Sequence, residues 1–295
     1  MSVPAAYLGM VLIWATTPLA IKWSNDGSDF MLAVSTRMSI GFVCCLLLLW
    51  VLRIPMRWDR AAVKSYVTSG IGMFGAMMSV YWAAQYIPSG LISVLYGLTP
   101  MMIGVFAALW LGEVFFTPSK IIGLLLALGG LGEIFLPEGS GISLSIYGVI
   151  GVLASVFFHS LSSVLVKRIG AQMHPLAQNS GALGVAVPLY IMCWLLFGAE
   201  IPEQLPHQTV GAILYLAIIG TVLGFNLYFY VLKQVPAMMI GLITLITPVL
   251  ALLLGQLLNG EQIGIHVWIG TCIILMGLGL YLWGGKVYRL LVPAR

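Results

Sequence analysis

Ten long apolar runs, separated by short polar breaks, most constrain what this chain can fold into. A helix needs about 20 mostly apolar residues to cross the hydrocarbon core of a bilayer. The short links leave no room for a soluble domain. The sequence therefore predicts an all-α integral membrane protein with ten transmembrane helices. The predicted spans are residues 5–23, 31–52, 65–86, 90–111, 118–136, 145–166, 176–198, 208–232, 236–258 and 263–284.

Composition supports this class. Hydrophobic residues make up 61% of the 295 residues and charged residues only 7%, whereas a soluble domain has about 25% charged residues. The four cysteines lie inside apolar runs, where thiols act as small buried hydrophobes rather than as a disulfide framework. The N-terminal stretch has no positively charged start, so we expect it to be a retained first span rather than a cleaved signal peptide.

Basic residues predict how the spans are oriented. Eleven of the thirteen lie in links or in the tail that fall on one side of a ten-span arrangement: Arg53, Arg57, Arg60, Lys64, Lys120, Lys167, Arg168, Lys233, Lys286, Arg289 and Arg295. Links near the cytoplasm carry an excess of Lys and Arg. Both termini are therefore predicted to be cytoplasmic, in the inner (plasma) membrane.

The chain also repeats itself. "GLTPMMIGVFAALWLGE" begins at Gly97, and "LITPVLALLLGQLLNGE" begins at Leu245, 148 residues later. The same offset aligns Gly72 with Gly220 and Pro88 with Pro236. The chain thus divides into two related halves, residues 1–147 and 148–295, each with five spans. Because five is odd, the second half must be inverted relative to the first, an arrangement typical of alternating-access transporters.

These features resemble a known family. Ten spans in two five-helix halves, the paired Thr-Pro and Gly-Glu motifs, and "IWATTPLAIKW" in the first span are similar to the drug/metabolite transporter superfamily and its EamA branch. The resemblance covers essentially the whole chain. It implies a ten-helix basket that moves small metabolites, often exporting amino acids or their relatives, and it places Trp14 among the candidate substrate contacts. The family usually has Trp-Gly where this chain has Trp14-Ala15.

Arg37 is the most unusual residue, because it lies about 10 Å along the second span at 1.5 Å per residue. A charge at that depth is costly to insert. One interpretation is an anchor for a carboxylate or phosphate, since the guanidinium fits both. The other is a snorkelling arginine that pairs with Asp26 or Asp29 in the preceding link.

Matching positions in the two halves predict a central cavity. In the third span Met78, Trp82 and Gln85 share a helical face, and the repeat equivalents of the first two in the eighth span are Asn226 and Tyr230. Such a set suits a small amphipathic solute, and its aromatic faces could also hold an ammonium group. The alternative is that the aromatic side chains fill the core or lie at the membrane interface.

Further candidates lie in the fourth, sixth, seventh and ninth spans. Tyr96 and its repeat equivalent Thr244 share faces with Pro100 and Pro248, and a proline frees a carbonyl within a helix. We therefore expect Pro100 and Pro248 to form a paired hinge, with a packing kink as the alternative.

His159 could bind substrate or carry a proton, or it could be a buried histidine paired with a hydroxyl. Asn179, in the first turn of its span, is either a cap or a cavity residue.

Other function classes lack their motifs. The histidines are scattered, and the sequence contains neither His-Glu-x-x-His nor a phosphate-binding loop. No catalytic residue, metal or cofactor is predicted. We expect a secondary transporter that exports amino acids or related small metabolites, acting as a monomer or homodimer. The alternative is a drug or organic-cation efflux protein of the same fold.

Overall fold

The computed structural model describes residues 3–112, 117–134, 145–197, 202, 204–234 and 243–291. Side chains are described over the same ranges except at Val3, 243–245 and 285–291. All regular structure within these residues is helical, which confirms the predicted all-α class. The helices are α1 (Val3–Asn25), α2 (Phe30–Val51), α3 (Arg60–Ala83), α4 (Ser89–Tyr96), α5 (Thr99–Leu111), α6 (Pro118–Ile134), α7 (Ile146–Ile169), α8 (Pro175–Phe197), α9 (His207–Tyr215), the π-helix η1 (Leu216–Gly224), α10 (Phe225–Gln234), α12 (Ile243–Asn259) and α13 (Ile265–Leu291).

Seven helical segments in the described chain are long and apolar enough to cross a membrane. They are Pro4–Asn25, Phe30–Val51, Ser89–Leu111, Ile146–Ile169, Pro175–Phe197, His207–Gln234 and Ile265–Gly284. Of the three other predicted spans, α3 has 24 residues, and α6 and α12 have 17 residues each. The start of the predicted ninth span, before Ile243, lies outside the described residues. The chain is thus a multi-pass membrane protein, and the count of ten spans stays a prediction.

Local sequence explains several helix ends. Asp29 precedes α2, and its carboxylate accepts a hydrogen bond from the Met31 amide at 2.7 Å, as helix N-caps do. Gly170 follows α7 with a φ of 64°, and its amide donates to the Val166 carbonyl. Only glycine adopts this left-handed conformation without strain, so α7 ends there.

The segment Ser89–Leu111 is interrupted in its middle. Helix α4 ends at Tyr96, and α5 begins at Thr99, so Gly97 and Leu98 separate them. In the second half α12 runs from Ile243 through Pro248 without interruption. The repeat places Leu245 where the first half has Gly97, and glycine weakens a helix more than leucine does.

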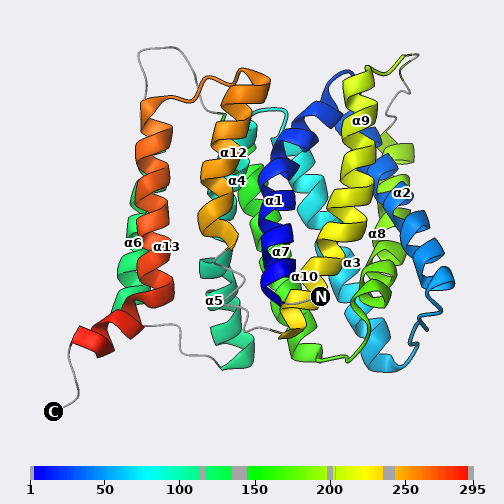
Figure 1. The fold of residues 1–295 in the computed structure, drawn as a ribbon, viewed down its shortest axis with the longest axis horizontal. Helices are drawn as coiled ribbons and strands as arrows, with labels where there is room; N and C mark the ends of the chain where they lie inside the picture. Colours follow the sequence, from blue (N-terminus) through cyan, green and yellow to red (C-terminus); the bar gives the residue numbers. More distant parts are fainter. Residues whose placement is uncertain are drawn as a thin grey trace.

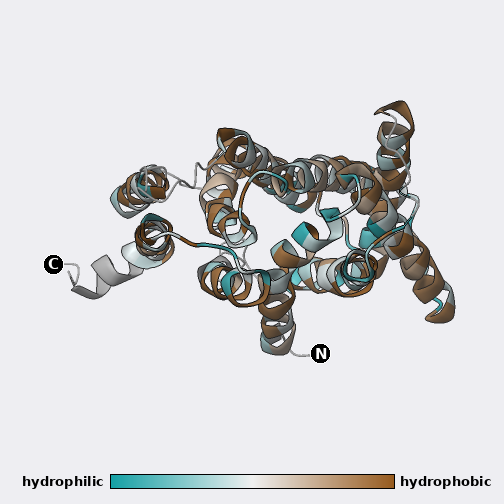
Figure 2. Cartoon of the chain, turned by 90° about the horizontal axis from the view of Figure 1, so that it is seen from above, coloured by the Kyte–Doolittle hydropathy of each residue, from teal (hydrophilic) through white to brown (hydrophobic). Residues whose placement is uncertain are grey.

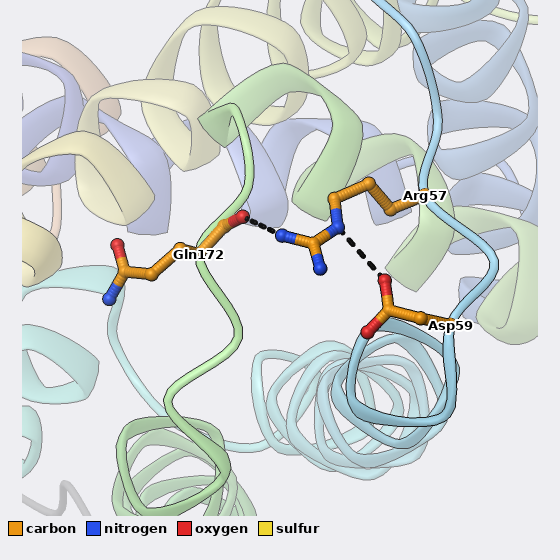
Figure 3. Close-up of polar contacts among 3 residues, drawn as sticks. All are labelled: Arg57, Asp59 and Gln172. Atoms are coloured by element: carbon orange, nitrogen blue, oxygen red, sulfur yellow. Dashed lines mark hydrogen bonds and ion pairs between the residues drawn. The ribbon is translucent and has the colours of Figure 1, made fainter.

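Hydrogen bonds join links that are distant in the sequence. Arg57, in the α2–α3 link, donates to Asp59 at 2.8 Å and to the carbonyl of Gln172, in the α7–α8 link, at 2.6 Å (Figure 3). These two links therefore lie at the same end of the bundle, the lower end in Figure 1.

The ends of α1 and α12 meet the start of α4. Trp23 donates its indole N–H to Asn259 at 2.8 Å. The Glu261 carboxylate accepts hydrogen bonds from the amides of Ser89 at 3.0 Å and Gly90 at 3.4 Å. Glu261 thereby caps α4 from the other half of the sequence. Its repeat partner Glu113 lies outside the described residues.

Helices α6 and α13 form a pair beside the rest of the bundle (Figures 1 and 2). They pack mainly on each other and make few contacts with other helices. A Cβ atom on Gly123 would lie 2.5 Å from the Gly277 carbonyl oxygen, and one on Gly130 would lie 2.6 Å from the Gly270 carbonyl oxygen. Small residues allow this close approach of helices within membranes. The glycine-bearing faces of α6 and α13 thus pack against each other within one chain.

Candidate functional site

A cavity of about 100 Å³ lies at the centre of the bundle, where helices from both halves of the sequence converge. Its walls come from α1, α2, α3, α4, α5, α7, η1, α10 and α12. The lining residues are Trp14, Thr17, Pro18, Ile21, Arg37, Met77, Val80, Ile92, Ser93, Tyr96, Thr99, Pro100, Ile103, His159, Gly220, Phe225 and Thr247. A mostly apolar wall with a few polar groups is typical of a small-molecule site.

Arg37 supplies the positive charge of this cavity. Its side chain is only 2% exposed, and Nε donates a hydrogen bond to Thr221 Oγ1 at 3.0 Å. Nη1 donates to the Tyr81 hydroxyl at 3.2 Å, and the guanidinium carbon lies 5.8 Å from the centre of the Tyr81 ring. Both partners are neutral. Burying an arginine within a membrane helix costs about 2.5–3.5 kcal/mol on insertion scales, and two neutral contacts offset only part of that cost.

Neither predicted acidic partner of Arg37 pairs with it. The ion pairs among the described residues are Arg57–Asp59 and His266–Glu133. Asp29 instead caps α2, and Asp26 is exposed in the α1–α2 link. The Arg37 charge is therefore not neutralised by any carboxylate within the described part of the chain.

His159 lies among aromatic rings on another wall. Its ring centre is 5.3 Å from that of Tyr228, 6.3 Å from that of Trp14 and 6.5 Å from that of Tyr96. The neighbouring Ser163 hydroxyl bonds to the His159 carbonyl and to Tyr228 rather than to the imidazole. Within the described residues no hydrogen bond to the imidazole is found. The arrangement gives the cavity a flat, aromatic side.

Hydroxyl-bearing residues form another part of the cavity wall. The Tyr96 hydroxyl bonds to Ser155 at 2.5 Å, which fixes the Tyr96 ring at the cavity. Thr99 and Thr247 both line the cavity. Thr99 Oγ1 is buried without a hydrogen-bond partner among the described residues.

Five of the residues that the sequence singled out thus meet at one cavity. Trp14, Arg37, Tyr96, Pro100 and His159 all line it, although they come from the first, second, fourth and sixth predicted spans.

The predicted face of α3 is turned away from the cavity. Met77 lines the cavity instead of Met78. Trp82 packs against Tyr86 with ring centres 5.1 Å apart. Gln85 lies beyond the end of α3, is exposed, and donates to the Trp82 carbonyl at 3.3 Å.

Asn179 and Asn226 lie behind the cavity wall. Asn179 is fully buried, and its amide donates to the Thr221 carbonyl at 3.1 Å and towards Cys45 Sγ at 3.6 Å. Asn226 donates to the Val222 carbonyl at 2.5 Å. Thr221 therefore contacts both Asn179 and Arg37, which makes Asn179 an indirect neighbour of the cavity.

The remaining predicted residues do not line the cavity. Tyr230 packs against the hydrophobic core. Pro248 is buried within α12 directly after the cavity residue Thr247. Thr244 is in the first turn of α12, and its side chain lies outside the described residues.

Two matched pairs of cavity residues were not singled out from the sequence. Met77 and Phe225 are 148 residues apart, as are Thr99 and Thr247, and all four line the cavity. The repeated Thr-Pro motif could have pointed to the two threonines. Met77 and Phe225 each precede a predicted residue by one position, a rotation of about 100° on a helix.

No group of three or more His, Cys, Asp or Glu side chains that could hold a metal ion occurs in the described parts of the chain. The lining itself offers one guanidinium, a few hydroxyl-bearing side chains and aromatic faces that can bind a small molecule.

Comparisons with known proteins agree with this architecture. The model of the EamA-like transporter family matches residues 3–136 and 146–283. The chain is 27% identical over 273 residues to a protein named uncharacterized transporter YoaV from Bacillus subtilis, which covers 92% of this chain and 93% of that protein. An uncharacterized transporter from Archaeoglobus fulgidus is 24% identical to this chain, and the match covers 91% of this chain and 94% of that protein.

An uncharacterized inner membrane transporter of Escherichia coli, YedA, is 27% identical over 68% of this chain and 66% of its own length. A solved crystal structure shares the fold with a TM-score of 0.72 at 19% identity and covers 97% of this chain and 99% of that one. These matches point to a transporter rather than an enzyme, and they confirm the resemblance found in the sequence. The chain belongs to the EamA-like transporter family.

Proposed function

We propose that the protein is a secondary transporter that exports amino acids or related small carboxylate-bearing metabolites by alternating access. The single observation that carries the substrate class is the buried guanidinium of Arg37, which lines the central cavity and whose hydrogen-bond partners among the described residues are neutral. A bound carboxylate would supply the missing negative charge and accept the hydrogen bonds that a guanidinium fork donates.

The proposed mechanism relies on two inverted five-helix halves, residues 1–147 and 148–295, with ten spans in all. The family model matches in two segments that fall within these halves. Equivalent residues of the halves, Thr99 and Thr247, line the same cavity. Inverted repeats around a central site allow the halves to exchange inward- and outward-open shapes. Pro100 and Pro248 are the proposed hinge points. The proposed partners are a small-molecule substrate and the lipid bilayer. The chain is proposed to act as a monomer or homodimer.

The proposed location is the inner (plasma) membrane, with both termini in the cytoplasm. The basic α2–α3 link and the α7–α8 link lie together at one end of the bundle, joined by Arg57 and Gln172. The last turn of α7, just before the second link, carries Lys167 and Arg168. This clustering of basic residues at one end is what the positive-inside rule requires. The similar YedA is named an inner membrane transporter.

The alternative is efflux of drugs or organic cations. Trp14, Tyr96 and His159 favour it, because aromatic walls accommodate lipophilic bodies and cations. Arg37 opposes it, because a cationic solute in the same cavity would be repelled by the guanidinium. The geometry therefore supports a carboxylate-bearing substrate better.

Counterflow in proteoliposomes tests the proposal. Purified protein is reconstituted, loaded with each unlabelled member of an amino-acid panel, and assayed for uptake of the same labelled compound. Wild type is compared with Arg37→Ala and with Arg37→Lys, which keeps the charge but loses the fork. We expect uptake by wild type, partial uptake by the lysine variant and loss in the alanine variant. Equal uptake by all three would remove Arg37 from the site, and counterflow of organic cations alone would establish the alternative.

A further inference from the structure

We infer that the cavity selects organic anions that lack a positive charge, so that monocarboxylates are better substrates than zwitterionic amino acids and their transport moves net negative charge across the membrane. This inference rests on the proposed function and narrows its substrate class. It follows from the charges that line the cavity and from the places where the acidic residues are found.

The cavity has a cationic end without a balancing anion. Arg37 is 2% exposed and lines the cavity, and its hydrogen-bond acceptors, Thr221 Oγ1 and the Tyr81 hydroxyl, are neutral. A carboxylate bound to Arg37 would neutralise this charge. An ion pair within a region of low dielectric is much stronger than one in water.

A substrate ammonium, in contrast, finds no anionic partner among the described residues that line the cavity. None of the described acidic residues lines it. Asp59 pairs with Arg57, Glu133 pairs with His266, and Glu261 caps α4. Asp29 caps α2, and Asp26 is exposed in the link before it. The other four acidic residues, Glu113, Glu138, Glu200 and Glu203, lie outside the described residues.

An α-ammonium would also stand close to Arg37. The carboxylate and the ammonium of an α-amino acid are on neighbouring carbon atoms, so a carboxylate held by Arg37 brings the ammonium near the guanidinium. The like charges repel each other in a buried site, and an ammonium without a partner loses its hydration. The aromatic faces of Trp14 and Tyr96 offer it only a cation–π contact.

The uncharged part of a monocarboxylate fits the rest of the wall. Trp14, Tyr96 and His159 present aromatic rings, and Ile21, Ile92 and Ile103 add aliphatic surface. Thr99 and Thr247 add two threonine side chains to this wall. The cavity thus has one site for an anion and a largely apolar remainder.

Net charge movement follows from this selection. In a cycle that carries the solute without another ion, the carrier returns to its starting state, so the charge transferred equals the charge of the solute. A monocarboxylate moves one negative charge, and a zwitterion moves none. A membrane potential therefore drives the accumulation of the first and not of the second.

The decisive experiment uses three labelled probes with the same phenylethyl frame: 3-phenylpropanoate, phenylalanine and phenethylamine. They are an anion, a zwitterion and a cation at pH 7.5. Uptake is measured in proteoliposomes under an inside-positive potassium–valinomycin potential and without one. Protein-free liposomes correct for diffusion of the uncharged acid and amine. We expect 3-phenylpropanoate uptake to exceed that of phenylalanine by roughly tenfold or more, as like-charge contact in a buried site implies. We also expect it to rise with the potential.

Each outcome separates this inference from the broader proposal. Phenylalanine uptake equal to or above that of 3-phenylpropanoate, insensitive to potential, would overturn the inference and leave amino-acid transport standing. Uptake of phenethylamine alone would overturn both. No uptake of any probe, while other amino acids show counterflow, would likewise overturn the inference alone. The potential dependence is measured on wild type, so it does not depend on whether an Arg37 variant folds.

Discussion

Arg37 Nε donates a hydrogen bond to Thr221 Oγ1 at 3.0 Å, and this contact joins α2 to the π-helix η1. The Thr221 carbonyl also accepts a hydrogen bond from Asn179, on α8. Thr221 therefore positions the cationic side chain of the cavity and connects it to a helix that does not line the cavity. π-Helical turns are frequently found at functional sites, and η1 places Gly220 beside the guanidinium, where a Cβ atom would lie 3.1 Å from Arg37 Nη2.

Replacing Thr221 by valine should weaken both the fold and the site. Valine matches the shape of threonine but leaves Arg37 Nε without its acceptor, and a buried unsatisfied donor costs about 1–3 kcal/mol. We expect a lower melting temperature in detergent and a KM for carboxylate counterflow raised roughly three- to tenfold. Thr221→Ser keeps the hydroxyl and is the matched control. A valine variant indistinguishable from wild type would show that Thr221 does not position Arg37.

Adjacent glycines on α6 give a test of the α6–α13 contact. A Cβ atom on Gly130 would lie 2.6 Å from the Gly270 carbonyl oxygen, whereas one on Gly129 would meet nothing within 4 Å. Gly130→Ala should therefore cost about 1–3 kcal/mol of stability through overpacking. Gly129→Ala should be neutral or should stabilise by up to about 1 kcal/mol, because alanine favours helix. Thermal unfolding followed by circular dichroism measures both. Equal melting temperatures for the two variants would contradict the close helix contact.

Glu261 should stabilise the start of α4. Its carboxylate accepts hydrogen bonds from the Ser89 and Gly90 amides and from the Asn259 side chain. Glu261→Ala should cost about 0.5–2 kcal/mol, the usual loss for a helix cap. Glu261→Gln keeps an acceptor and loses the charge that favours a helix N-terminus, so its loss should be smaller.

Gln262→Ala is the matched control for this cap, because Gln262 is the exposed neighbour in the same link. Melting temperatures should rank wild type and Gln262→Ala highest, then the glutamine variant, then the alanine variant. An alanine variant as stable as its control would show that the cap is not required.

The two prolines of the repeated motif should differ in their effect on turnover. Pro248 lies inside α12, where alanine would restore a backbone hydrogen bond. Pro100 is the second residue of α5, where an amide lacks an intrahelical partner in any case. If Pro248 is a hinge, a restored hydrogen bond of about 1 kcal/mol must be broken each time α12 bends. This adds about 1 kcal/mol to the barrier, which corresponds to roughly fivefold slower turnover.

We therefore expect Pro248→Ala to lower the maximal counterflow rate at unchanged KM and Pro100→Ala to have a smaller effect. Initial rates over a range of substrate concentrations separate the two parameters. A larger effect at Pro100 would place the moving element at the α4–α5 break instead.

The sequence predicted the all-helical fold because a segment that crosses lipid must satisfy its backbone hydrogen bonds internally, and a long apolar run does so as a helix. It also singled out Arg37, because a charge deep in an apolar run has few structural explanations. What it could not supply was the rotation of each helix. The 148-residue offset relates two segments that both reach the cavity, but Met77 and Phe225 line the cavity where Met78 and Asn226 were expected. In a helix that is apolar on all sides, the periodicity of hydrophobic residues does not show which face points towards the cavity.

Contacts between segments that are distant in the sequence could not be predicted from the sequence either. Thr221 and Tyr81 hold Arg37 where Asp26 or Asp29 were the expected partners. Both acids are near Arg37 in the sequence, whereas Thr221 follows it by 184 residues. A prediction based on proximity in the sequence favours nearby acidic residues, whereas helix packing in the folded protein brings Thr221 and Tyr81 to Arg37.

The pairing of α6 with α13 also bears on how the protein is made. Helix α6 is synthesised more than 130 residues before its partner begins, since α6 ends at Ile134 and α13 begins at Ile265. Until the ribosome completes the last helix, the glycine face of α6 must be covered by lipid or by other proteins of the insertion machinery. Chains that stop before Ile265 lack this partner, so the final helix couples the assembly of the first half to the completion of the second.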